Sequence, residues 1–208
     1  MPSQIHVSRL SRVLGILSNK HFPSPITATL PAANYWGVDQ HIEYGKDNTI
    51  LPTTAGIVDT GTTLILIATD AYERYVAATG AVFDSTVGLL SVTQSQYECM
   101  KSLYFVIGGV SLYFALQNDP PFYSMTLLSQ ERLELIPNAQ IWPRSLNTEI
   151  GGKPDSIYLI VADLGTTSGQ GLDFINGLTF LQRYYSVYDT ANKRVGFAAT
   201  PNTMDTTN

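Results

Sequence analysis

The stretch 55–67 places a single carboxylate, Asp59, between two apolar runs of the kind that form buried strands. An ionisable group in that setting is costly unless the fold satisfies its oxygens or uses its charge. The residues that follow it, Thr60, Gly61 and Thr62, suit this task, because hydroxyl groups and backbone amides can donate to a carboxylate and glycine lets the backbone approach closely. We therefore expect the rest of the fold to serve this stretch.

The composition excludes several classes of function. The chain carries 12 basic and 17 acidic residues, a net charge of −5, so we expect no nucleic-acid partner. The single cysteine, Cys99, leaves no intrachain disulfide or thiolate cluster, and the three histidines lack ligand spacing. We therefore expect no metal and no cofactor. No apolar run reaches the about 20 residues of a membrane span, so we expect no membrane partner.

Alternation of apolar and polar residues predicts a mostly β chain. Strands are expected at 26–30, 35–44, 49–51, 56–58, 63–67, 89–92, 104–107, 140–142 and 158–161, with a final hairpin around the turn 189–193. A helix is expected with Asp70 as its N-cap, Glu73 in the capping-box position and Gly80 at its C-terminal end. A second short helix is expected just after Gly177.

Two motifs stand in order along the chain. Ile-Val-Asp-Thr-Gly-Thr-Thr occupies 57–63, and Phe-Ile-Asn-Gly occupies 174–177, followed by Arg-Tyr-Tyr-Ser-Val-Tyr-Asp at 183–189. Together they resemble the C-terminal lobe of the pepsin-like aspartic proteases, in detail the branch of this family found in wood-rotting fungi. The resemblance covers about 26–201, and it implies one mostly β lobe of the pepsin-like acid protease fold, with two or more short helices.

The resemblance also implies roles for the residues of both motifs. Asp59 would be one of two catalytic carboxylates, with the Gly61 amide and the Thr62 hydroxyl donating to it. Thr60 would join a pair of threonines that meet across two lobes. A neighbouring strand would complete a ψ-shaped arrangement, formed by Phe174, Ile175, Asn176 and Gly177. Asn176 departs from the apolar residue common at its position, which we interpret as a trait of the fungal branch.

The implied activity is that of an aspartic endopeptidase, which hydrolyses peptide bonds of a polypeptide substrate. The reaction needs two carboxylates about 3 Å apart that share a water, one of them protonated. Asp59 is the only Asp followed by Thr-Gly or Ser-Gly, so a missing N-terminal lobe or a second copy must supply the other. We expect the chain alone to be inactive. The alternative is a non-catalytic β-domain that binds peptide or a partner lobe.

The sequence also predicts boundaries. We expect 1–25 to be an atypical N-terminal segment without clear structure, 26–201 to be the lobe and 202–208 to be a loose tail. Within the lobe, 110–130 is apolar-rich and interrupts the family pattern, so we interpret it as a retained intron translated in frame or as a surface insertion. We expect no signal-peptide core in the segment ahead of the lobe. A secreted or vacuolar location therefore rests on the resemblance alone.

Overall fold

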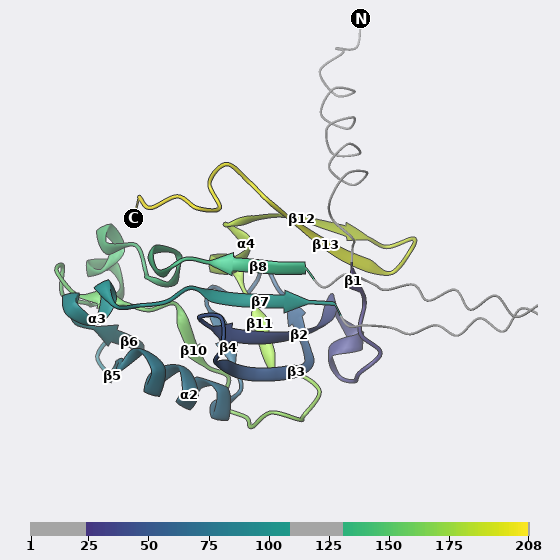
Figure 1. The fold of residues 1–208 in the computed structure, drawn as a ribbon, viewed down its shortest axis with the longest axis horizontal. Helices are drawn as coiled ribbons and strands as arrows, with labels where there is room; N and C mark the ends of the chain where they lie inside the picture. The colour runs from purple at the N-terminus through teal and green to yellow at the C-terminus, as the bar shows by residue number, and fades with distance from the viewer. Residues whose placement is uncertain (1–23, 109–130, 208) are drawn as a thin grey trace, which may run out of the picture.

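The computed structural model describes residues 24–108 and 131–207. A curled seven-stranded sheet, in the order β10-β4-β11-β3-β2-β7-β8, forms the body of the protein (Figure 1). Its strands are β2 (Gly37–Tyr44), β3 (Thr49–Val58), β4 (Ile65–Ile67), β7 (Leu103–Ile107), β8 (Glu131–Leu135), β10 (Val161–Asp163) and β11 (Phe174–Asn176). The prediction of a mostly β fold is confirmed.

Two smaller sheets flank the large one. One has the order β1-β13-β12 and the other the order β5-β6-β9. Their strands are β1 (Ser24–Pro25), β12 (Tyr184–Asp189), β13 (Arg194–Ala199), β5 (Val82–Asp84), β6 (Leu89–Val92) and β9 (Ile157–Tyr158). Residues 24 and 25 thus form a strand where the sequence predicted no clear structure.

Three α-helices occur among the described residues, α2 (Thr69–Thr79), α3 (Gln94–Glu98) and α4 (Leu178–Leu181). Helix α2 ends at Gly80, as predicted, because Gly80 adopts a left-handed φ of 68° that residues with a Cβ rarely adopt. The predicted capping box at its start is wrong. Ala68 is the N-cap and no side chain caps the helix, because Asp70 lies inside the first turn and binds elsewhere.

Further local predictions differ from the structure. The strand expected at 26–30 is absent, since β1 ends at Pro25. The strand expected at 140–142 is absent, since the short 3₁₀ helix η2 (Pro137–Gln140) ends there and Ile141 makes only an isolated bridge to Leu159. Helix α3 was not predicted. It begins after Thr93, whose side chain accepts from the Gln96 amide while the Gln96 side chain accepts from the Thr93 amide. The remaining 3₁₀ helices are η1 (Ala32–Asn34), η3 (Arg144–Leu146) and η4 (Thr148–Ile150).

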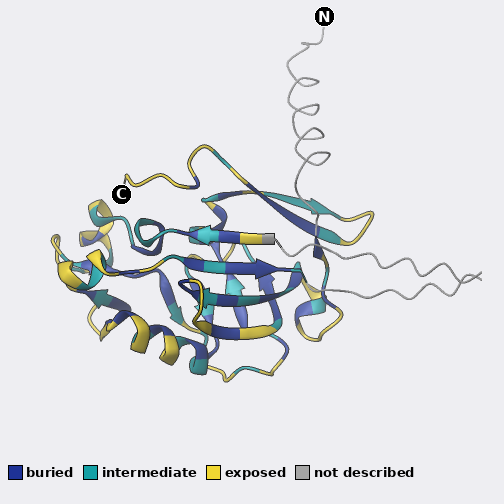
Figure 2. Ribbon diagram, viewed as in Figure 1, coloured by how far each residue is buried: buried dark blue, intermediate teal, exposed yellow. Residues whose placement is uncertain are grey.

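All seven strands of the large sheet contribute buried residues to the core (Figure 2). An aromatic cluster joins this sheet to the β12–β13 hairpin. Phe180 of α4 is fully buried, with its ring centroid 4.9 Å from that of Phe105, 5.1 Å from that of Tyr184 and 5.5 Å from that of Phe197. Phe180 lies four residues after Asn176, the last residue of β11. Its packing therefore fixes the chain where it leaves β11, close to Asp59.

The segment 109–130 lies outside the described residues, as do 1–23, so the interpretations placed on them stay predictions. The two strands that border 109–130 are nevertheless informative. Strands β7 and β8 pair antiparallel, with Ile107 opposite Glu131. The chain therefore leaves the sheet and returns to it at two paired positions.

The prediction of a loose tail is wrong at Thr203, which is 3% exposed. Its hydroxyl donates to the carbonyl of Arg183 at 2.5 Å, and the Arg183 guanidinium donates to the carbonyl of Asp205 at 2.7 Å. Polar composition alone did not reveal these contacts, which tie the tail to the start of β12.

The aromatic cluster yields a stability prediction. Phe180→Ala should lower the free energy of unfolding by about 3–5 kcal/mol, because it leaves a cavity between three rings. Phe83→Ala removes an equal side chain that is 57% exposed and should change the stability by no more than about 0.5 kcal/mol. Urea unfolding followed by circular dichroism measures both, and equal losses in the two variants would contradict the assigned packing.

Candidate active site

Asp59 is delivered by the end of β3 into a crossing of strands. Strands β3 and β4 are consecutive in the chain, yet β11 lies between them in the sheet, parallel to β3 and antiparallel to β4. Asn176 pairs with Val58, and its carbonyl accepts a hydrogen bond of 3.2 Å from the Asp59 amide. The loop that carries Asp59 thus passes over the end of β11, so the structure brings the two sequence motifs together.

The Asp59 carboxylate has a donor on each oxygen. The Gly61 amide donates to Oδ1 at 2.9 Å, and the Thr62 hydroxyl donates to Oδ2 at 2.7 Å. These are the contacts that the resemblance implied for Gly61 and Thr62. The Gly61 hydrogen bond, with that of Thr62, lowers the pKa of Asp59 below its usual value, and partial burial opposes this only weakly. The geometry therefore holds a single, ionised carboxylate at neutral pH.

Thr60 and the partner strand take different positions around this carboxylate. Thr60 is exposed, and its hydroxyl makes no hydrogen bond within the described residues. Phe174 and Asn176 point into the core and are fully buried, whereas Ile175 is only half-buried. Gly177 lies against the Asp59 loop, since a Cβ there would stand 2.2 Å from the carbonyl oxygen of Leu64. Gly61, Thr62 and Asn176 thus contact Asp59 directly, and Gly177 contacts its loop. Phe174 and Ile175 pair further along β3 and β4, and Thr60 faces outward without a side-chain partner among the described residues.

A cavity of about 500 Å³ opens beside Asp59. Its lining is mostly apolar and comprises Ile26, Asn34, Tyr35, Trp36, Ile57, Val58 and Asp59. The Trp36 ring packs on Tyr188, with centroids 5.0 Å apart. Burial raises the pKa of Tyr188, and the negative charge of Asp59 adds to this effect. Sequence reasoning missed Tyr35 and Trp36 as a wall of the site, because nothing in an alternating strand pattern shows which ring borders a cavity.

The loop 164–173 is held by a buried carboxylate. Asp173 is fully buried, and no cation lies against it among the described residues. It is satisfied instead by the Thr54 hydroxyl, the Gly169 amide at 2.6 Å and the Gln170 amide at 2.9 Å. Buried polar groups cost little when they are fully hydrogen-bonded, so Asp173 can fasten this loop to β3.

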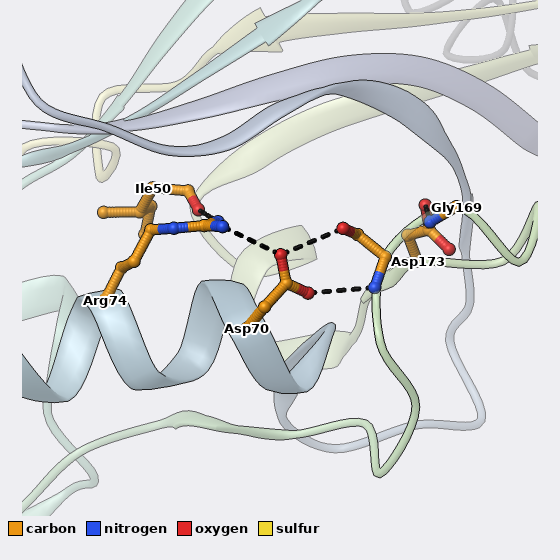
Figure 3. Close-up of polar contacts among 6 residues, drawn as sticks. Ile50, Asp70, Arg74, Gly169 and Asp173 are labelled. Carbon is orange, nitrogen blue, oxygen red and sulfur yellow. Dashed lines mark hydrogen bonds and ion pairs between the residues drawn. The ribbon is translucent and has the colours of Figure 1, made fainter.

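A second carboxylate, Asp70, holds the same loop from helix α2 (Figure 3). It accepts from the Ser168 amide and hydroxyl, each at 2.9 Å, and from the Arg74 guanidinium at 3.0 Å, which also donates to the carbonyl of Ile50 at 2.7 Å. Burial raises the pKa of Asp70, but the bonds from Ser168 and the charge of Arg74 outweigh it, so the pKa lies below its usual value.

The loop in turn supports the wall of the cavity. Gly171 adopts a φ of +82°, and a Cβ there would stand 2.0 Å from the carbonyl oxygen of Leu30. The Ala32 amide donates to the carbonyl of Gly171 at 3.3 Å. Since Ala32 begins η1, which leads directly to Tyr35 and Trp36, the loop fixes the segment that lines the cavity.

The residues 24–108 and 131–207 contain no group of three or more His, Cys, Asp or Glu placed to hold a metal ion. Over the same ranges, no helix is both long and apolar enough to cross a membrane. Cys99 is exposed and unpaired.

The Thr62 hydrogen bond yields a prediction about the charge of Asp59. Thr62→Val removes the hydroxyl donor but keeps the shape of the side chain, so the pKa of Asp59 should rise toward its usual value. Thr63→Val alters the exposed neighbour and serves as the control. Carboxyl carbon shifts recorded against pH by NMR measure the titration, and an unchanged Asp59 in Thr62→Val would show that the hydroxyl does not stabilise the charge.

The Asp70 bonds predict a pH-dependent stability. A carboxylate with a lowered pKa in the folded state stabilises the fold above its unfolded pKa, and this gain disappears as the pH falls through the folded pKa. Asp70→Asn should therefore cost about 1 kcal/mol at pH 7 and progressively less below about pH 4. Asp47→Asn, in an exposed turn, should change little. Urea midpoints from pH 2 to pH 8 test this, and a constant difference would contradict it.

Comparisons with known proteins agree with this geometry. A profile of the family described as "Eukaryotic aspartyl protease" matches residues 9–119, more than half of the chain. The match begins within the segment that the sequence predicted to be atypical. Polyporopepsin of Irpex lacteus is 55% identical over 185 residues, which are 89% of this chain and 48% of that protein. The protein named "Probable vacuolar protease A" of Arthroderma benhamiae is 29% identical over 189 residues, 86% of this chain and 37% of that protein.

The structure shows the same relationship. It matches the crystal structure of the aspartic proteinase from Irpex lacteus with a TM-score of 0.79 and 53% identity, over 92% of this chain and 50% of that chain. The chain therefore spans about half the length of polyporopepsin and of that solved relative. In sequence and in fold, this chain belongs to the pepsin-like family of eukaryotic aspartyl proteases.

Proposed function

We propose that this chain is the C-terminal catalytic lobe of an aspartic endopeptidase and that Asp59 supplies one of its two catalytic carboxylates. The observation that carries the proposal is the setting of Asp59. It stands at the crossing of β3, β11 and β4, with a donor on each oxygen and an open cavity beside it. A carboxylate with a purely structural role would have its oxygens directed at the fold and away from an accessible space.

The proposed chemistry uses Asp59 as half of a pair. A second carboxylate about 3 Å away cannot ionise at the same time, so the pair holds one proton between pH values set by both groups. The ionised member removes a proton from the attacking water, and the protonated member donates to the substrate carbonyl. The hydrogen bonds from Gly61 and Thr62, which lower the pKa of Asp59, keep one carboxylate of the pair ionised in acidic solution.

The second carboxylate would come from a partner that meets the Asp59 side of this chain. Thr60 supports this part of the proposal, because it is exposed beside Asp59 and its hydroxyl makes no bond within the described residues. In the proposal, Thr60 pairs with the matching threonine of an N-terminal lobe or of a second copy. The half-length match to polyporopepsin supports an N-terminal lobe as the partner.

The proposed substrate is an extended polypeptide that lies across the cavity. The apolar lining from Ile26, Tyr35 and Ile57 favours an apolar substrate side chain next to the cleaved bond. A secreted or vacuolar location is part of the same proposal, supported by the printed name of the Arthroderma relative.

A second candidate is a lobe that binds peptide or a partner without hydrolysis. One observation favours it. Among the described residues, the lining of the cavity holds one carboxylate, that of Asp59, and its pKa is lowered. One ionised carboxylate can activate water but cannot at the same time protonate a carbonyl. On this reading the cavity still binds apolar side chains, and Asp59 acts only as an anion.

The experiment that separates the two candidates is lobe complementation. The purified 208-residue chain, alone and mixed with the N-terminal half of polyporopepsin, is assayed for casein cleavage at acid pH, with and without pepstatin. The chain alone should be inactive, and the mixture should show pepstatin-sensitive cleavage. Asp59→Asn should reduce the cleavage by at least about a thousandfold, because it removes one of the two carboxylates. Asp47→Asn should leave it unchanged.

Each outcome decides between the candidates. Cleavage by the pure chain that rises with the square of its concentration would identify a second copy as the partner. A mixture that binds casein or pepstatin but does not cleave would favour the non-catalytic lobe. Equal cleavage by Asp59→Asn and the unchanged chain would refute the assignment of Asp59.

A further inference from the structure

Two amide side chains meet in the core behind the Asp59 loop. Asn176 Nδ2 donates to Gln40 Oε1 at 2.8 Å, and Gln40 Nε2 donates to Asn176 Oδ1 at 3.3 Å. Both residues are 0% exposed. They are 136 residues apart in the sequence, and neither amide contacts solvent. The two side chains therefore satisfy each other in a setting where an unpaired amide is costly.

The pair joins two strands that are not neighbours. Gln40 lies in β2 and Asn176 in β11, and β3 runs between these strands in the sheet. In β2, Gln40 occupies the inward stripe whose other members, Val38, Ile42 and Tyr44, are apolar. An apolar residue at either position could pack in several relative placements of the two strands. A reciprocal amide pair is satisfied in only one of them, which is how buried polar groups specify register.

Asn176 also holds Asp59 directly. Its carbonyl accepts the hydrogen bond from the Asp59 amide at 3.2 Å, while its side chain is fixed by Gln40. The same residue therefore connects the core amide pair to the backbone of Asp59. A shift of Asn176 along β11 would therefore move the backbone of Asp59 and change the distances from its carboxylate to the donors of Gly61 and Thr62.

We propose that Gln40 and Asn176 are positioning residues that set the placement of Asp59 by locking β11 to β2 across β3. Asn176 does more than replace an apolar residue, because its buried amide is hydrogen-bonded only when Gln40 lies opposite it. The importance of the pair for catalysis rests on the proposed function, but its effect on Asp59 is measured without any catalytic assay.

The test uses Gln40→Leu, Asn176→Leu and the double variant in the full chain. Two readouts report on Asp59 alone, namely the hydrogen exchange of its backbone amide and the titration of its carboxyl carbon by NMR. Each single variant should accelerate exchange of the Asp59 amide by about tenfold relative to the amides of β5 and β6. Each should also move the pKa of Asp59 up toward its usual value, because the carboxylate loses its alignment with Gly61 and Thr62.

Gln140→Leu is the matched control. Gln140 is also a fully buried amide, with its oxygen accepting from the Tyr75 hydroxyl at 3.0 Å and its nitrogen donating to the carbonyls of Lys101 and Leu135. None of these partners lines the cavity beside Asp59. This variant should destabilise the whole fold as much as the single variants do, yet leave the exchange relative to β5 and β6 and the titration of Asp59 unchanged.

The double variant separates positioning from simple satisfaction of amides. Replacing both partners by apolar side chains leaves no unpaired group, so the fold should recover most of the lost stability even if a single variant fails to fold. Exchange of the Asp59 amide should nevertheless stay fast, since nothing then selects one placement of β11. A double variant whose Asp59 exchanges and titrates as in the unchanged chain would overturn the proposal. Failure of lobe complementation with normal Asp59 readouts would instead count against the proposed function only.

Discussion

The insertion of β11 between β3 and β4 is the constraint on which the site depends. Two strands that follow each other in the chain are forced apart by a third strand that arrives more than a hundred residues later. The connection between them must therefore cross the end of that strand, and Asp59 stands at the crossing, with its amide bound to Asn176. Because the backbone there is held on both sides, Gly61 and Thr62 can present fixed donors to the carboxylate.

Local features of this chain could be predicted because they depend on near neighbours. The alternation in β2, the end of α2 at Gly80 and the bonds around the Asp59 carboxylate all involve residues a few positions apart. The start of α2 could not be predicted, because the carboxylate of Asp70 binds Ser168, which is 98 residues away. Helix α3 is a different case, since the capping box of Thr93 and Gln96 involves residues three positions apart and is visible in the sequence.

The candidate site shows the same division between near and distant contacts. The motifs identified Asp59 and the strand that accompanies it, but nothing in the sequence connected Gln40 with Asn176. Asn176 could be recognised as unusual only by comparison with the family pattern, and Gln40 only as a polar residue in an apolar stripe. Tyr35 and Trp36 became part of the site only when the packing of η1 against Gly171 was known.

The pairing of Ile107 with Glu131 has a consequence for how the gene can vary. Two residues that pair across antiparallel strands can be joined by a tight turn or by a long loop. The entropic cost of closing the loop grows only slowly with its length. Messages that keep or remove the codons for 110–130 would therefore both join these two strands, since removal leaves Gly108 and Gly109 as a two-residue connection between the pair.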